Sequence, residues 1–203
     1  VEVVRDEFAR LERESVPQGG LQIGALSHSI EFRGVSFSYD PRVGDVLSQV
    51  SFTIPARTTV AMVGASGAGK STIMRILMGL IRADAGEVDV CGHRLPEAQV
   101  AAKREVGYAS EDMRLYKTQT LRWHMDFIQG IFPEWDEAYA AQLLKRFDLK
   151  SQQKLGGFSH GQRVKAALLL ILARRPKLLL LDEPTTGLDP VARAEVLEAL
   201  ADV

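Results

Sequence analysis

The sequence predicts an α/β fold in which a mostly parallel sheet is flanked by helices. Three observations predict it: strand-like and helix-like patterns alternate along the chain, a glycine-rich loop follows one predicted strand, and an acidic pair follows another. Alternating strands and helices build parallel sheets because each helix carries the chain back across the sheet. Such sheets bind ligands at the carboxyl ends of their strands.

The first part of the chain predicts one helix and then two strands. Apolar residues recur at helical spacing over residues 1–11, and the segment 17–20 breaks that pattern. A linker then continues to about Ser29. Strand-like runs follow at residues 30–39 and 46–54.

The rest of the chain alternates between the two patterns and has an all-helical middle, which we interpret as an insertion. Predicted strands lie at residues 58–63, 86–91, 105–109 and 178–181. Predicted helices lie at residues 70–80, 118–149, 160–174 and 190–200, and Pro133 divides the second of them. The segment 58–63 is β-branched and apolar, as expected of a strand that is buried on both faces.

The composition is that of an ordinary globular protein, with 203 residues, 46% hydrophobic residues and a formal net charge of -1. The near-zero charge argues against bulk electrostatic attraction to nucleic acid. Cys91 is the only cysteine, so no intrachain disulfide forms. The longest aliphatic run, residues 166–173, is far shorter than the about 20 residues of a membrane span. The chain has no signal peptide and no initial Met, which suggests a fragment or a processed product.

Residues Gly64 to Ser71 match the phosphate-binding pattern G-x-x-x-x-G-K-[ST], between a predicted strand and a predicted helix. Glycines let the backbone curl so that successive N–H groups face a phosphate, and the helix start adds its dipole. Lys70 is suited to reach the β- and γ-phosphates, and the Ser71 hydroxyl is suited to bind Mg²⁺. The pattern therefore predicts nucleotide binding rather than a simple glycine turn.

Asp182 and Glu183 follow the run of leucines at residues 178–181. Charged residues are common at exposed strand ends, so the pair alone has an ordinary explanation. With the phosphate loop upstream, we predict that Asp182 holds Mg²⁺ and that Glu183 polarises the attacking water.

The segment Phe158-Ser159-His160-Gly161-Gln162 stands directly before a strongly apolar helix. Ser159 followed by Gln162 is the pattern of a capping box. Helix capping explains the two residues, and a capped helix start is also an anion site. Both interpretations hold together.

With this segment, Asp182-Glu183-Pro184-Thr185 and Gly187-Leu188-Asp189-Pro190, the chain resembles the ATP-binding cassette (ABC) ATPases over residues 30–203. The three segments look like the family's signature, Walker B motif and D-loop. The resemblance implies a P-loop NTPase fold with an antiparallel β subdomain near the N-terminus. It also implies that a helical subdomain at about residues 112–175 carries the signature. This ATPase domain, residues 30–203, follows the helix and linker predicted at residues 1–29.

The resemblance implies ATP and Mg²⁺ as cofactors and gives roles to residues by position. It implies catalytic roles for Glu183, Lys70 and Glu111, and Mg²⁺ ligation by Ser71, Asp182 and Glu111. It implies nucleotide contacts for Tyr39, Gly64, Ala65, Ser66, Gly67, Ala68, Gly69, Lys70, Ser71, Thr72, Ser159, Gly161 and Gln162. Tyr39 matches the aromatic residue that stacks on adenine, although a strand-edge core residue has the same pattern.

The chain departs from the family pattern at three positions. Glu111 occupies the Q-loop position, where Gln is usual, and its added charge puts the γ-phosphate contact in doubt. Phe158 stands where Leu is usual, and His160 where Gly is usual. We interpret His160 as pointing to solvent, with a weakened or pH-tuned contact as the alternative.

The resemblance also implies partners. ABC ATPase domains pair head to tail around ATP and drive transmembrane partner domains, which places this chain on the cytoplasmic side of the cell membrane, either peripheral or tethered. No nucleic acid is expected.

The helical insertion contains four large aromatic residues: Trp123, Phe127, Phe132 and Trp135. We interpret them as packing in a small helical core rather than touching a partner. Phe147 and Leu149 are interpreted as core residues as well.

The two halves of the sequence resemble different ABC exporters. The first half resembles exporters whose ATPase is fused behind a membrane domain, and the second resembles stand-alone ATPase subunits of bacterial export transporters. The alternatives are a soluble ABC ATPase that acts on ribosomes or DNA, and a regulatory cassette that binds ATP without hydrolysing it.

The family's switch histidine lies beyond the D-loop helix, and no histidine of this chain matches it. The four histidines are His28, His93, His124 and His160, all of which precede Asp182. The resemblance therefore implies a cassette that is incomplete at the C-terminus, with weak hydrolysis and reduced stability.

Overall fold

The computed structural model describes residues 30–201 except 57, 66, 111 and 112. The helix and linker predicted at residues 1–29, and the candidates Ser66 and Glu111, lie outside the described residues. The chain divides into two compact units, Val1–Glu105 and Val106–Val203.

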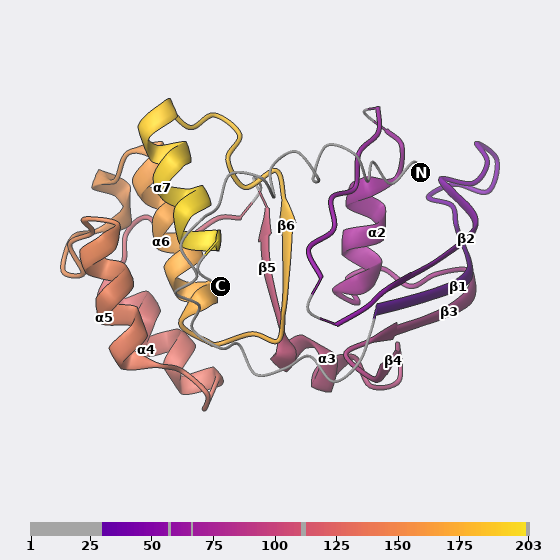
Figure 1. Ribbon diagram of the computed structural model, residues 1–203, viewed down its shortest axis with the longest axis horizontal. Helices are drawn as coiled ribbons and strands as arrows, with labels where there is room; N and C mark the ends of the chain where they lie inside the picture. Colours follow the sequence, from indigo (N-terminus) through magenta and orange to yellow (C-terminus); the bar gives the residue numbers. More distant parts are fainter. Residues whose placement is uncertain (1–29, 57, 66, 111–112, 202–203) are drawn as a thin grey trace. The chain divides into compact units, whose positions relative to one another are not determined.

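The first unit contains a four-stranded antiparallel sheet (Figure 1). Its strands are β1 (Ile30–Phe37), β2 (Leu47–Ile54), β3 (Ala85–Val90) and β4 (His93–Leu95), in the order β2-β1-β3-β4. Its helices are α2 (Lys70–Leu77) and α3 (Gln99–Glu105). This sheet confirms the antiparallel β subdomain, whereas β4 and α3 are elements that the sequence patterns did not predict.

The buried face of β1 changes from even to odd positions along the strand. Ile30 and Phe32 are buried, and then Val35 and Phe37. The pairing register with β2 shifts between Phe32 and Val35, and Gly34 lies in that interval with a φ of 59°. A bulge adds one residue to the strand, so the alternation of side chains restarts and the apolar residues stay in the core.

The prediction of a buried strand at residues 58–63 is wrong. The structure places no strand there, and the side chains of Val60 and Val63 are exposed. A β-branched apolar run becomes a buried strand only when strands on both sides take up its backbone hydrogen bonds. None of the described ladders includes these residues.

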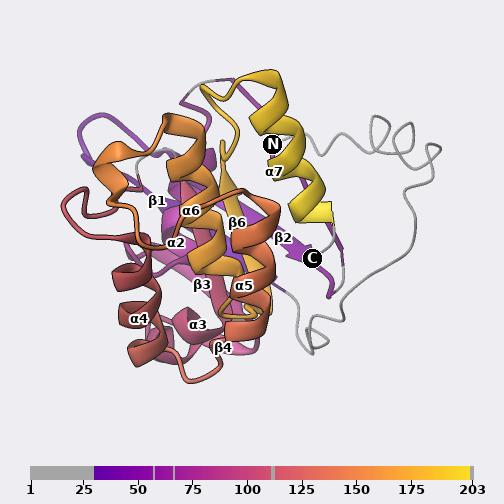
Figure 2. The ribbon, with the colours of Figure 1, turned by 90° about the vertical axis from the view of Figure 1, so that its left-hand side faces the viewer.

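The second unit contains a two-stranded parallel sheet of β5 (Val106–Ser110) and β6 (Leu178–Asp182). Its helices are α4 (Leu121–Ile131), α5 (Glu137–Arg146), α6 (His160–Leu172) and α7 (Pro190–Ala201), with a 3-10 turn, η1, at Leu155–Gly157. All four α-helices lie on one side of the β5–β6 pair (Figures 1 and 2). This arrangement confirms the α/β class, and among the described ladders the parallel one joins β5 and β6 alone.

The core of the second unit forms around α6, which is apolar through its last two turns. Residues 166–173 are all buried, and side chains from α4, α5 and α7 surround them. Trp135, Phe147 and Leu149 are buried, as predicted. Burial of so many side chains is what stabilises an isolated helical layer.

The prediction that Trp123 and Phe127 pack in this core is wrong. Their exposed fractions are 38% and 51%, and the two rings stack on each other at 5.4 Å on the outer face of α4. The residues are four positions apart, so they share one helix face. Leu121, which precedes both rings, and Met125, which lies between them in the sequence, occupy the buried face instead.

The start of α5 is fixed by a charged cluster. The Asp136 carboxylate accepts a hydrogen bond from the Tyr139 backbone N–H at 2.8 Å and is paired with Arg175 at 2.9 Å. The Arg175 guanidinium also lies 3.6 Å above the Tyr139 ring. The Tyr139 N–H and the Arg175 guanidinium hold the pKa of Asp136 below its ordinary value of 3.8. The cluster ties α5 to the segment between α6 and β6.

Candidate functional site

The predicted phosphate loop has the backbone that its glycines predict. Gly67 and Gly69 have φ angles of 82° and 85°, in the left-handed region that glycine adopts without strain. Helix α2 begins directly after Gly69, and no side chain caps its first turn. Gly64, Ala65, Gly67 and Ala68 are exposed. The loop therefore curls around a helix start whose first N–H groups are available to an anion.

Lys70 lies across this loop. Its ammonium group donates hydrogen bonds to the carbonyl oxygens of Gly64 at 2.7 Å and Ala65 at 2.9 Å. The charge is thus held at the mouth of the loop, where it can neutralise a bound phosphate. Ser71 and Thr72 follow in the first turn of α2, with Thr72 buried and Ser71 partly exposed.

Tyr39 is joined to the phosphate-loop helix through its hydroxyl group. The hydroxyl lies 3.3 Å from the Thr72 hydroxyl and accepts a hydrogen bond from Arg75 at 3.2 Å. The hydrogen bond with Thr72, together with Arg75, lowers the pKa of Tyr39 below its ordinary value of 10.0. The ring itself is 55% exposed, and its edge packs against Phe37. An exposed ring anchored beside the loop is suited to stack on a base.

The sequence analysis did not identify Arg75 as a partner of Tyr39, although its spacing from Thr72 could have indicated it. Thr72 and Arg75 are three positions apart on α2, so they share the helix face that Tyr39 meets. A Cβ at Gly69 would lie 2.8 Å from Leu47 Cδ2, so any larger residue there would require the Leu47 side chain to move.

In the second unit, Asp182 is the last residue of β6 and pairs in register with Ser110, the last residue of β5. Both side chains therefore stand at the carboxyl edge of the parallel pair, as predicted. Glu183 follows with a φ of 53°, a conformation that residues other than glycine adopt rarely. Strained backbone of this kind clusters at functional sites.

A tight turn follows the acidic pair. The Thr186 backbone N–H donates to the Glu183 carbonyl at 3.2 Å, and the Thr186 hydroxyl donates to the Glu183 carboxylate at 3.1 Å. Asp189 then caps α7 by accepting from the N–H groups of Val191 and Ala192. The sequence analysis did not identify Thr186 as a candidate residue. Its position three residues after Glu183 could have indicated that the two residues meet across a turn.

The signature-like segment has the predicted capping box. The Ser159 side chain accepts from the Gln162 backbone N–H, and the Gln162 side chain accepts from the Ser159 backbone N–H. A Cβ at Gly161 would lie 3.3 Å from Ala192 Cβ, so the start of α6 packs closely on α7. His160 is exposed, but its Nε2 lies 3.2 Å from the Thr186 carbonyl oxygen. The interpretation that His160 merely points to solvent is therefore wrong.

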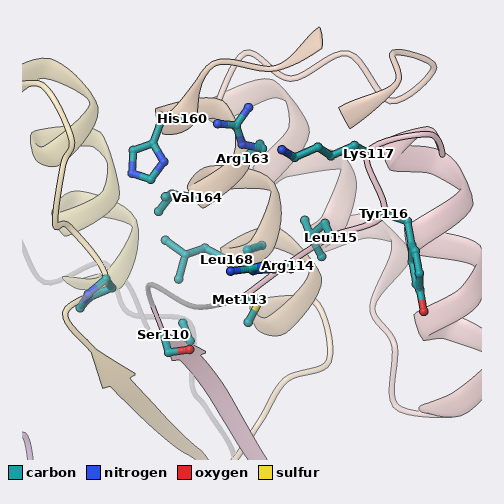
Figure 3. Close-up of a pocket in the computed structure, with 13 residues that line it drawn as sticks. Ser110, Met113, Arg114, Leu115, Tyr116, Lys117, His160, Arg163, Val164 and Leu168 are labelled. Carbon is teal, nitrogen blue, oxygen red and sulfur yellow. The ribbon is translucent and has the colours of Figure 1, made fainter. Parts of the chain in front are cut away.

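A pocket of about 470 Å³ lies beside the start of α6 (Figure 3). Its wall includes residues 113–117 and two turns of α6, with an apolar floor that contains Val164 and Leu168. Lys117 extends toward Arg163 along its upper part (Figure 3), and the Arg163 guanidinium donates a hydrogen bond to the Phe158 carbonyl oxygen. Arg114 is the third cation, and no described lining residue is a carboxylate. Three cationic side chains therefore line this pocket.

The comparison with family models supports one assignment. A model described as "ABC transporter" matches residues 47–186. That range contains the phosphate loop, the signature-like segment and the acidic pair. The chain belongs to this family.

Among curated proteins, this ABC chain is 32% identical over 173 residues to the ABC transporter ATP-binding protein YtrB of Bacillus subtilis, and the match covers 85% of this chain and 58% of that protein. It is 31% identical to Nod factor export ATP-binding protein I of Mesorhizobium japonicum, covering 97% of this chain and 60% of that protein. It is 32% identical to the ATP-dependent lipid A-core flippase of Methylococcus capsulatus, covering 90% of this chain and 32% of that protein. The ABC chain thus spans about three fifths or less of these relatives.

Solved ABC structures share the fold. The structure of an ATP binding subunit of an ABC transporter matches with a TM-score of 0.72 and 28% identity, covering 85% of this chain and 73% of that chain. A bacterial Atm1-family ABC exporter with ATP bound matches with a TM-score of 0.74 and 25% identity, covering 96% of this chain and 36% of that one. These matches confirm the P-loop NTPase fold and an ABC nucleotide-binding domain.

The residues of this ABC domain fit a magnesium nucleotide. In the first unit, the loop offers backbone N–H groups and the Lys70 ammonium group to phosphates, and Ser71 offers a hydroxyl oxygen. In the second unit, Asp182 offers a carboxylate, and both kinds of oxygen are ligands that Mg²⁺ prefers. No group of three or more His, Cys, Asp or Glu residues suited to a metal occurs in the described part of the chain. Over the same residues, no helix is long and apolar enough to cross a membrane.

Proposed function

We propose that this chain binds Mg·ATP and hydrolyses it as the ATP-binding domain of an export transporter. The observation that carries the proposal is an uncapped helix start behind a curled glycine loop, with Lys70 held at its mouth. The motifs that follow along the chain add the carboxylates and the signature that turnover requires.

Each candidate residue has a role in ATP binding or hydrolysis that follows from the chemistry of its side chain or backbone. Backbone N–H groups of the loop and Lys70 bind the phosphates, and Tyr39 stacks on the base. Ser71 and Asp182 hold Mg²⁺, which when bound neutralises charge on the transferring phosphoryl group. Glu183 orients and polarises the attacking water. Glu111 contributes a further carboxylate at the Q-loop position.

The signature residues act on a second ATP-binding domain. Ser159, Gly161 and Gln162 bind the ATP held by the other domain of a head-to-tail pair, and the same contact is made in reverse. Two equivalent contacts of this kind form an isologous, two-fold interface. The basic pocket beside α6 supports this role, because Arg114, Lys117 and Arg163 raise the local potential for a polyphosphate.

The pair drives transmembrane partner domains from the cytoplasmic side of the membrane. The names of the relatives support this assignment: Nod factor export in one and lipid A-core flipping in another. The exposed rings of Trp123 and Phe127 on α4 give the helical layer an apolar surface that such a partner would cover.

Replacing Glu183 with Gln tests the proposal. The full gene product that carries this chain, assembled with its transport partners, should bind Mg·ATP with unchanged affinity in calorimetry. Phosphate release should fall about 100-fold or more, because the lost carboxylate acts on water in the transition state. The control is Glu198→Gln, which makes the same change at an exposed residue of α7. Equal turnover in the parent and Glu183→Gln would sink the proposal.

One observation favours a second candidate, a regulatory cassette that binds ATP without turnover. His160 replaces the usual Gly of the signature, so an imidazole stands at the helix start that a phosphate would have to approach. Tight ATP binding by the parent protein with no phosphate release above background would select this candidate.

A further inference from the structure

The imidazole of His160 bridges the start of α6 and the turn after β6. Its Nε2 lies 3.2 Å from the Thr186 carbonyl oxygen. A carbonyl oxygen only accepts hydrogen bonds, so Nε2 must carry the proton and donate it. The sequence difference at the signature therefore creates a contact that glycine at this position could not make.

Thr186 carries the connection onward to Glu183. Its hydroxyl donates to the Glu183 carboxylate at 3.1 Å, and its backbone N–H donates to the Glu183 carbonyl at 3.2 Å. The first bond fixes the rotation of the carboxylate, and the second closes the turn. Because Glu183 has a left-handed backbone, its side-chain direction depends on this turn being kept.

The surrounding residues leave room for the imidazole. Gly187 has a φ of 71°, and a Cβ there would lie 3.3 Å from His160 Nε2. The start of α6 is also held against α7, through the close approach of Gly161 to Ala192 and through an ion pair between Lys165 and Glu195. The helix start that carries His160 is thus fixed in place, while the ring itself stays exposed.

We propose that His160 and Thr186 are positioning residues for the Glu183 carboxylate. The imidazole holds the Thr186 backbone, and the Thr186 hydroxyl holds the carboxylate at the angle that water activation requires. The chain thereby links its own signature helix to its own Walker B carboxylate. This inference rests on the proposed role of Glu183 in ATP hydrolysis.

The first experiment measures steady-state phosphate release by the full gene product with its partners. His160→Leu and Thr186→Val should each lower kcat about 3- to 10-fold, the effect of one hydrogen bond, with KM for ATP changed less than about twofold. His160→Gln and Thr186→Ser keep the donors and should restore most of the loss. The control His93→Leu removes a histidine of β4 and should leave kcat at the parent value.

The double variant gives the sharpest outcome. The imidazole acts on the Thr186 backbone, and the Thr186 hydroxyl is the group that contacts the Glu183 carboxylate, so His160→Leu should have a smaller effect once Thr186 is Val. The loss of kcat in the double variant should therefore be smaller than the product of the two single losses. Independent, additive losses would overturn the proposal, and so would an unchanged kcat in His160→Leu.

A second readout needs neither nucleotide nor turnover. The backbone N–H groups of Thr186 and Leu188 close the turn by bonding to the carbonyls of Glu183 and Thr185. In the nucleotide-free chain, His160→Leu should speed hydrogen exchange of both by about 3-fold or more, while His160→Gln should not. Unchanged exchange would overturn the proposal. If the exchange changes but the parent releases no phosphate, the proposed function fails and the contact between α6 and the turn stands.

Discussion

Helix α2 and the helices of the second unit begin in opposite ways. A side chain caps α4 at Thr120, α5 at Asp136 and α6 at Ser159, and Asp189 caps α7. Helix α2 begins at Gly69 with no side-chain cap and no acidic residue in its first turn. The capped helices satisfy their first N–H groups from within the chain, whereas α2 leaves them for an anion.

The difference shows where the chain forgoes local stability for binding. A side-chain cap stabilises a helix by about 1 kcal/mol. At α2 that contribution is missing, and a lysine stands where the helix dipole favours a negative charge. A bound phosphate would satisfy the N–H groups and the ammonium group together. Helix α6 differs, because its capping box satisfies its first N–H groups from within the chain.

The largest expected effect is that of Lys70→Ala on nucleotide binding. Lys70 is held by the loop backbone through hydrogen bonds to the carbonyl oxygens of Gly64 and Ala65. Its loss should weaken Mg·ATP binding about 10- to 100-fold in titration calorimetry, as expected for one charge-assisted hydrogen bond. Lys145→Ala, at an exposed position of α5, is the matched loss of charge. Parent-like affinity in Lys70→Ala would remove the contrast between α2 and the capped helices.

A pair of glycine variants sharpens the comparison. Gly69→Ala forces a left-handed backbone on alanine and brings Cβ to 2.8 Å from Leu47 Cδ2, so it should lower the free energy of unfolding by about 1–3 kcal/mol. Gly161→Ala has no positive φ and meets Ala192 Cβ at 3.3 Å, so it should cost less than about 1 kcal/mol. Urea unfolding of the three proteins gives both values. The reverse order would show that the start of α6 is the more constrained of the two.

The smallest expected effect is the pH dependence contributed by the cap of α5. The pKa of Asp136 is lowered from its ordinary value of 3.8 by the Tyr139 backbone N–H and by Arg175. Because the folded pKa is the lower one, this carboxylate stabilises the fold fully at pH values above 3.8 and less as the pH falls through the folded pKa.

Asp136→Asn should therefore flatten the acid limb of the stability curve below about pH 4. Thermal unfolding from pH 7 to pH 3 measures this limb. Asp126→Asn, on the exposed side of α4, is the control. Parallel acid limbs in the parent and Asp136→Asn would show that another carboxylate dominates there.

Some features of the candidate site depend only on residues that are close together in the sequence, and others depend on contacts between distant residues. The positive φ angles of Gly67 and Gly69, the capping box of Ser159 and Gln162, and the position of Asp182 at a strand end were all predictable. Each depends on a few neighbouring residues. The contact between His160 and Thr186 was not predictable, because the two lie 26 positions apart and meet only when α6 packs beside the turn after β6.

The sequence by itself determined the α/β class, most helix starts and ends, and the order of the ATP-binding motifs. Capping, glycine geometry and apolar periodicity act within one or two turns, so they can be recognised without a fold. The tertiary structure alone decided that residues 58–63 form no strand and that Trp123 and Phe127 are exposed. A strand needs a partner and a side chain needs a covering surface, and both come from distant parts of the chain.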